Sequence, residues 1–261
     1  MRRDLIVVGA SAGGVEALRD LVAGLPPELP AAVAVVLHLP AGGSSALAQI
    51  LSRAGPLPAV SAGSGMPLVE GRVHVAPPDR HLLVVGDHLV LSEGPTENGH
   101  RPAVDALFRS AATAAGARTV GVLLSGVLND GVAGLVAIRA RGGAVVVQHP
   151  EDALYPGMPE NALRHVDADL VLPARDIGPA LGLLASGSVD QAPERRRDET
   201  FERAVWAGLR SLEERERLAT RMGDAAGDKG DGNRAGRYRR QAEEAGQAAE
   251  VLRRFLLSRD E

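Results

Sequence analysis

Residues 5–22 read LIVVGASAGGVEALRDLV, and this stretch decides the fold. An apolar, β-branched run at Leu5–Val8 stops at a turn of small residues, and a helix-like run at Val15–Val22 follows at once. A short, continuous apolar run is typical of a strand that is buried on both faces of a parallel sheet. The stretch therefore predicts a strand, a tight glycine-rich turn that presents Ser11, and a helix.

The same alternation continues along the chain. Apolar runs at residues 32–37, 120–124 and 144–147 predict further buried strands, while residues 72–76 and 81–91 indicate an inserted β-rich portion with a turn at 85–87. The predicted helices span residues 15–23, 45–54, 104–115, 131–141, 159–164 and 176–184. We therefore expect an α/β fold with a doubly wound, mostly parallel sheet and an inserted β-hairpin region, with ligands at the carboxyl ends of the strands.

The composition changes near residue 185. We predict an α/β domain over residues 1–185, which would hold the catalytic site, and a charged linker over 186–198. Apolar residues then recur at helical spacing, interrupted by a Gly- and Asp-rich segment, which predicts a C-terminal helical hairpin over 199–258. Such a hairpin is typical of a structural arm, and it could also join two copies in a homodimer.

Bulk composition excludes several classes of function. The net charge of −4 argues against a nucleic-acid-binding protein that depends on overall charge. The chain has no cysteine, which excludes disulfides, thiolate metal sites and cysteine nucleophiles. No run is long enough for a membrane-spanning helix or shaped like a signal peptide, so we expect a cytoplasmic protein without membrane insertion.

The turn at Gly9–Gly13 fits two kinds of chemistry. It matches the G-x-S-x-G pattern of a serine nucleophile, but glycine-rich turns after a first strand more often bind phosphate. A dinucleotide site would need glycine at Ser11 and an acidic residue at the end of the second strand, where His38 stands instead. A nucleophile is therefore favoured, and a nucleotide- or phosphate-binding turn stays open as an alternative.

His38 and Asp130 complete the hypothesis of a catalytic triad. Each follows a predicted strand, so both should lie with Ser11 at one edge of the sheet. A histidine could then accept the serine proton, and an aspartate could orient the imidazole. Taken singly, a histidine that ends a strand is most often structural, and an aspartate that starts a helix is most often its N-cap.

Six segments resemble one family. The chain is similar to the catalytic domain of chemotaxis protein-glutamate methylesterases, the CheB family, from about Leu5 to Leu184. The resemblance lies, in the order of the family's motifs, in residues 9–18, 36–40, 76–83, 100–112, 126–131, and 148 with 157–159.

The resemblance implies a mechanism. The triad would be Ser11, His38 and Asp130, with backbone N–H groups near Ala12 and Val127 holding the oxyanion. The reaction would be hydrolysis of glutamate γ-methyl esters on the cytoplasmic helices of a chemoreceptor, with release of methanol. Some members of the family also deamidate glutamine. No metal and no organic cofactor would be required.

Other residues of the shared motifs are candidates for substrate binding. Arg80, His81, His100 and Arg101 could contact an acidic receptor helix or line the cleft, and they could equally be loop residues bonded to neighbouring carbonyls. We also predict that Met158 contacts the substrate. Family members usually carry a receiver domain before the catalytic domain, and this chain starts at the first strand, so we expect a stand-alone enzyme controlled in another way. A non-catalytic signalling module that binds a receptor stays open as a further alternative.

Overall fold

The computed structural model describes residues 2–38, 45–127 and 129–187, together with 216–224, 227, 235–236, 238–243 and 246. The chain divides into two compact units, Met1–Gln191 and Ala192–Glu261. In the second unit, residues 216–224 and 238–243 are helical, whereas most of the predicted linker and hairpin lies outside the described residues. The hairpin and its role in a dimer therefore stay predictions.

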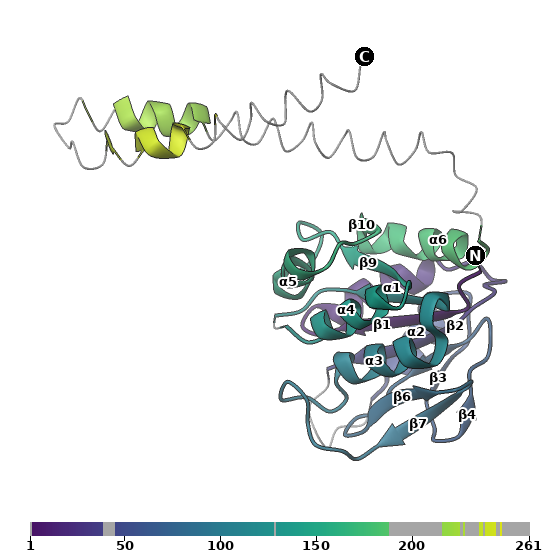
Figure 1. Cartoon of the computed structure of the whole chain (residues 1–261). Coiled ribbons are helices and arrows are strands. Elements are labelled where there is room, and N and C mark those ends of the chain that lie inside the picture. Colours follow the sequence, from purple (N-terminus) through teal and green to yellow (C-terminus); the bar gives the residue numbers. More distant parts are fainter. Residues whose placement is uncertain are drawn as a thin grey trace. The chain divides into compact units, whose positions relative to one another are not determined.

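A seven-stranded parallel sheet forms the centre of the first unit (Figure 1). β1 (Leu5–Ala10) lies between β2 (Ala32–Leu37) and β8 (Thr119–Leu123). The sheet continues with β5 (Val73–Val75) and β3 (Ala59–Ser61) beyond β2, and with β9 (Ala144–Gln148) and β10 (Leu170–Leu172) beyond β8. The strand order reverses between β1 and β8, where ligands bind in open α/β sheets.

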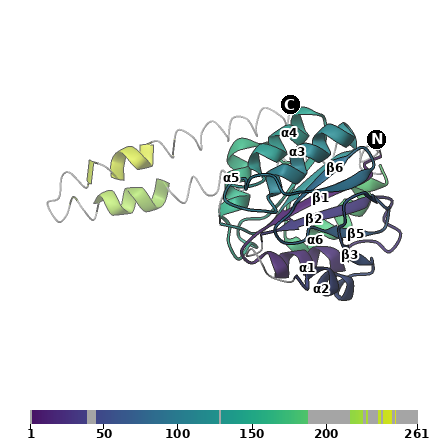
Figure 2. The same ribbon diagram turned by 90° about the horizontal axis from the view of Figure 1, so that it is seen from below.

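Helices cover both faces of the sheet (Figure 2). One face packs against α1 (Gly14–Ala23), α2 (Leu47–Ala54) and α6 (Ala174–Ala185), and the other against α3 (Val104–Ala115), α4 (Val132–Ala140) and α5 (Gly157–His165). Ile6 and Val8 of β1 point to the first face, and Val7 points to the second. This burial on both faces explains the continuous apolar runs and confirms the predicted fold class.

A smaller antiparallel sheet lies beside α3. It consists of β4 (Met66–Pro67), β7 (His88–Ser92) and β6 (His81–Val85), and it contains the predicted hairpin. The prediction that residues 72–76 belong to this inserted portion was wrong. β5 pairs in parallel with β2 and β3 and so extends the main sheet, and its three residues are buried as the central strands are. A short 3₁₀ turn, η1 (Gly116–Arg118), precedes β8.

None of the helices in the described ranges combines the length and the apolar character needed to cross a membrane.

Candidate active site

Three adjacent strands bring the predicted triad together. Ser11 follows β1 and His38 follows β2, and the last residues of these strands, Ala10 and Leu37, pair directly in the register of the sheet. Asp130 lies on the loop after β8, on the other side of β1. All three side chains therefore come from the carboxyl ends of the central strands.

A chain of hydrogen bonds joins the three side chains. Nδ1 of His38 lies 3.0 Å from Oγ of Ser11, and Nε2 of His38 lies 2.7 Å from Oδ2 of Asp130. A carboxylate accepts only, so Nε2 carries the ring proton and Nδ1 is left to accept the serine hydroxyl proton. This is the tautomer that a general base needs.

Asp130 is fully buried, and it accepts four hydrogen bonds. Besides His38, its donors are the backbone N–H groups of Val104 and Asp105, at 2.7 and 2.9 Å, and Nδ2 of Asn98 at 3.0 Å. Burial alone would raise the pKa of Asp130, but the bonds from His38 and the other donors outweigh it and lower the pKa to about 2. The aspartate therefore caps the start of α3 rather than that of its own following helix, α4, whose N-cap residue is Gly131.

His100 stacks on the imidazole ring of His38. The two imidazole rings stack with centroids 3.6 Å apart and an interplanar angle of 8°. Burial lowers the pKa of His100, and the charge of His38 lowers it further. A neutral His100 can lie against His38 without opposing the positive charge that His38 acquires when it accepts a proton.

The loop after β8 packs tightly against the serine turn. The Ser11 N–H donates to the carbonyl of Ser125 at 2.9 Å, and the Ser125 hydroxyl donates to the carbonyl of Ala12 at 2.8 Å. A Cβ atom at Gly126 would lie 2.9 Å from Cβ of Ser11, so only glycine lets the loop approach this closely. The N–H groups of Ala12 and Val127 have no acceptor within the described ranges, as an oxyanion site requires.

Two predicted substrate-binding residues instead hold a loop, residues 93–103. The Arg101 guanidinium donates to Oδ1 of Asp79 and to the carbonyls of Glu93 and Gly94. His81 is 3% exposed, and both of its ring nitrogens are used within this loop, by the carbonyl of Pro95 and the N–H of Ala103. Because both side chains are engaged in holding this loop, we leave both out of the binding site proposed below.

The other two predicted residues differ in exposure. Arg80 is half-exposed and pairs with Glu93 at 2.7 Å. Met158 is fully buried, and its sulfur would lie 1.9 Å from a Cβ atom at Gly126. Met158 therefore packs against Gly126, in the loop that contacts Ser11.

An apolar rim borders the serine turn. Its members, Val127, Leu154 and Tyr155, are 55%, 69% and 44% exposed. A Cβ atom at Gly13 would lie 2.8 Å from Cβ of Leu154, and the Tyr155 carbonyl accepts the N–H of Gly126. These three side chains therefore belong to the same surface as the nucleophile turn.

The described ranges hold one group of side chains with the spacing of a metal site. It consists of His38, His100 and Asp130, whose ligand atoms lie within 4.8 Å of one another. Both nitrogens of His38 and both oxygens of Asp130 are already used by the hydrogen bonds above.

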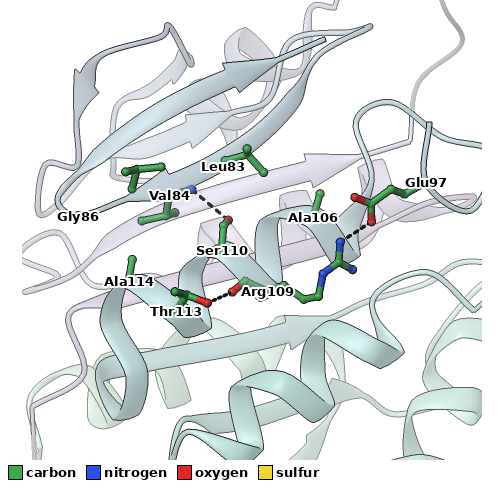
Figure 3. Close-up of a pocket in the computed structure, with 10 residues that line it drawn as sticks. Leu83, Val84, Gly86, Glu97, Ala106, Arg109, Ser110, Thr113 and Ala114 are labelled. Atoms are coloured by element: carbon green, nitrogen blue, oxygen red, sulfur yellow. Dashed lines mark hydrogen bonds and ion pairs between the residues drawn. The ribbon is translucent and has the colours of Figure 1, made fainter. Parts of the chain in front are cut away.

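A separate hollow of about 550 Å³ lies between β6 and α3 (Figure 3). The Val84 N–H donates to the Ser110 hydroxyl across its floor, and Glu97 and Arg109 form an ion pair at one end. None of the predicted site residues lines it.

Sequence reasoning missed three polar residues that support the triad. Asn98 bonds Asp130, Ser125 ties the two loops together, and the buried amide of Gln148 accepts the N–H of Ser125 at 2.9 Å. Gln148 stands in a shared motif, and Asn98-Gly99 is a turn signal. Neither signal shows that the residue faces the triad, because these contacts join segments distant in sequence.

Comparison with known proteins identifies the family. The model of the CheB methylesterase family matches residues 6–181. The chain belongs to the CheB methylesterase family. Its fold also matches the crystal structure of the Thermotoga maritima CheB methylesterase catalytic domain, with a TM-score of 0.68 and 32% identity, covering 70% of this chain and all of that one.

Several curated relatives share the matched region. A protein-glutamate methylesterase/protein-glutamine glutaminase of Anaeromyxobacter dehalogenans is 44% identical over 184 residues, which is 70% of this chain and 54% of the relative. A relative of the same name from Ralstonia nicotianae is 40% identical over 179 residues, which is 67% of this chain and 47% of the relative. The chain spans about half the length of these relatives.

Proposed function

We propose that this chain hydrolyses glutamate γ-methyl esters on a chemoreceptor-like protein and releases methanol. The observation that carries the proposal is the hydrogen-bond chain from Ser11 through His38 to Asp130. The names of the curated relatives supply the substrate class, and the geometry supplies the groups for acyl transfer.

Each step of the reaction has a group in place. Ser11 Oγ attacks the ester carbonyl carbon while Nδ1 of His38 accepts its proton, and Asp130 stabilises the resulting imidazolium through Nε2. The N–H groups of Ala12 and Val127 bind the oxyanion. Methanol leaves with the proton from His38, and water then hydrolyses the acyl-enzyme by the same route in reverse. Removing one oxyanion donor typically raises the barrier by about 3–4 kcal/mol.

The same site supports a second activity, the deamidation of glutamine. The acyl-enzyme would be identical, and ammonia would leave in place of methanol. The relatives are named for both activities, and a proton on His38 can be delivered to either leaving group.

The surface around Ser11 supports a helical protein substrate. The exposed apolar rim of Val127, Leu154 and Tyr155 matches the apolar face of an amphipathic helix. Arg80 is half-exposed and suits acidic residues on such a helix. We propose that the receptor helix lies over this rim with its methylated glutamate directed at Ser11.

Replacing the nucleophile tests the proposal. The substrate is a synthetic amphipathic helical peptide that carries one glutamate γ-methyl ester, and released methanol is measured. Ser11→Ala should lose at least about 1000-fold in kcat without a change in unfolding midpoint. Ser52→Ala, at an exposed position on α2, is the matched control and should keep full activity. Equal turnover by Ser11→Ala and wild type would refute the serine mechanism.

The same experiment separates the alternative functions. Peptide binding without turnover by the wild type would favour a non-catalytic receptor-binding module. Saturable binding of a nucleotide in calorimetry, lost in Ser11→Ala, would favour a phosphate-binding turn.

A further inference from the structure

Two buried carboxylates lie together behind the triad. Asp130 is 0% exposed and Asp105 is 5% exposed. Asp130 accepts the N–H groups of Val104 and Asp105 at the start of α3, and Oδ1 of Asp105 accepts the N–H of Gly134 in the first turn of α4 at 2.7 Å. Asp130 therefore caps α3, the helix that contains Asp105, and Asp105 caps α4, the helix that begins just after Asp130.

Such a pair needs a shared donor. Two neighbouring carboxylates repel each other when both are ionised, and burial strengthens the repulsion. Burial raises the pKa of Asp105, and the charge of Asp130 raises it further. Two buried carboxylates that repel each other in this way compete for one proton. If Asp130 took that proton, it would lose the charge that stabilises the His38 imidazolium.

Asn98 supplies that donor. Its Nδ2 lies 3.0 Å from Oδ1 of Asp130 and 3.0 Å from Oδ2 of Asp105. A side-chain amide carries two N–H groups, so each carboxylate receives one of them. The flipped orientation of the amide is excluded, because it would place the amide oxygen, an acceptor, against two carboxylate oxygens, which also only accept.

The backbone holds Asn98 in this position. Glu97 and His100 exchange two backbone hydrogen bonds, at 3.1 and 2.8 Å, and close a tight turn around Asn98-Gly99. Asn98 has a φ of +51°, in the left-handed region that asparagine tolerates better than most residues. The ion pair between Glu97 and Arg109 fastens the turn to α3 (Figure 3).

We propose that Asn98 is a positioning residue of the esterase, which donates one N–H to Asp130 and one to Asp105 and so fixes the Asp130 carboxylate with Oδ2 toward His38. The catalytic consequence rests on the proposed function, whereas the hydrogen bonding does not. With Oδ1 held by Asn98 and the N–H of Asp105, the carboxylate cannot rotate away from the imidazole.

Two substitutions distinguish this role from a general loosening of the loop. Asn98→Gly keeps the left-handed backbone and removes the amide. Asn98→Asp keeps the shape but replaces two donors with a third carboxylate. If Asn98 only shaped the turn, Asn98→Asp would be the milder change. Our proposal gives the opposite order, with Asn98→Asp the more severe, because it adds repulsion to the lost bonds.

The first measurement does not depend on the substrate. In the proton NMR spectrum, the His38 Nε2–H bonded to Asp130 should give a downfield resonance that weakens in Asn98→Gly and disappears in Asn98→Asp. Asp87→Asn, at an 88% exposed carboxylate outside this turn, is the control and should leave the resonance unchanged.

The second measurement is methanol release from the methyl-ester peptide. Asn98→Gly should lower kcat by about 10- to 100-fold with KM nearly constant, the usual effect of losing a hydrogen bond to a charged group. Failure of the wild type to release methanol would refute the proposed function and leave the NMR comparison valid. An unchanged His38 Nε2–H resonance in both folded variants would overturn the role of Asn98.

The wild-type protein decides the question if neither variant folds. Asn98 and Gln49 on α2 are both exposed, so the difference between them reports the two hydrogen bonds of Asn98. The side-chain amide protons of Asn98 should then exchange with solvent at least about tenfold more slowly than those of Gln49. Equal exchange rates would overturn the proposal.

Discussion

Replacing Asp130 with asparagine tests the whole polar arrangement at once. The two oxygens of Asp130 face two donors each: His38 and the N–H of Val104 at Oδ2, and Asn98 and the N–H of Asp105 at Oδ1. In Asp130→Asn, one of these oxygens becomes an NH₂ group. Whichever way the new amide turns, two donors lose their acceptor.

The cost to stability follows from that count. A buried donor without an acceptor costs about 1–3 kcal/mol, so two of them should lower the free energy of unfolding by about 2–6 kcal/mol. The pKa of Asp130 gives an independent figure. Its lowering from 3.8 to about 2 corresponds to about 2 kcal/mol of stability, which is present above pH 4 and is lost as the pH falls toward 2.

The cost to activity is larger, because the tautomer of His38 changes. An NH₂ group facing His38 favours the tautomer in which Nε2 accepts and Nδ1 carries the proton. Nδ1 then cannot accept the proton of Ser11. In serine hydrolases the equivalent substitution lowers kcat by about 10⁴-fold, and we expect a loss of that order.

The assay measures methanol release and urea unfolding on the same samples at pH 7. Asp87→Asn is the matched control, because that carboxylate is 88% exposed and bonds only its neighbour His88 among the described residues. A folded Asp130→Asn enzyme with more than a tenth of wild-type kcat would refute the reasoning.

Two further predictions concern buried positions. Burial, with Arg72, lowers the pKa of His74 from 6.5 to about 4, so the free energy of unfolding should fall by about 3 kcal/mol as the pH drops from 6.5 to 4. His74→Gln should flatten that dependence in urea titrations, and an unchanged slope would contradict it. Gly126→Ala places a Cβ atom 1.9 Å from the Met158 sulfur, so it should cost about 1–3 kcal/mol and most of the activity. Gly63→Ala, whose Cβ atom would meet only Cε of Met66 at the ordinary contact distance of 3.8 Å, should cost neither.

The sequence was sufficient to predict the layered fold because its strands are buried on both faces. The runs at Leu5–Ala10 and Ala32–Leu37 have no polar side chain, and β9 has one only at its last residue, Gln148, so the predicted and observed strands nearly coincide. The short strands β3, β4 and β10 escaped prediction. They have two or three residues each and no fully buried position, so no periodic pattern marks them.

The prediction of the site shows the same limit. Ser11, His38 and Asp130 could be grouped because parallel strands end at a common edge. The partners of Asp130 could not be predicted. Asn98 lies 32 residues earlier in the chain, and no local sequence pattern shows that its turn folds back onto Asp130. The contacts of His81 with Pro95 and Ala103 could not be predicted either, because they too join segments that are distant in sequence.

Because Asp130 caps α3 and Asp105 caps α4, the catalytic carboxylate depends on the starts of both helices. A designer who transplanted only the serine turn, the histidine and the aspartate onto another parallel sheet would obtain a bare carboxylate in an apolar interior. That carboxylate would take up a proton, and the imidazole would lose its counter-ion. The smallest portable unit therefore runs from Glu97 through Gly134 and includes two helix starts, together with the ends of β1 and β2.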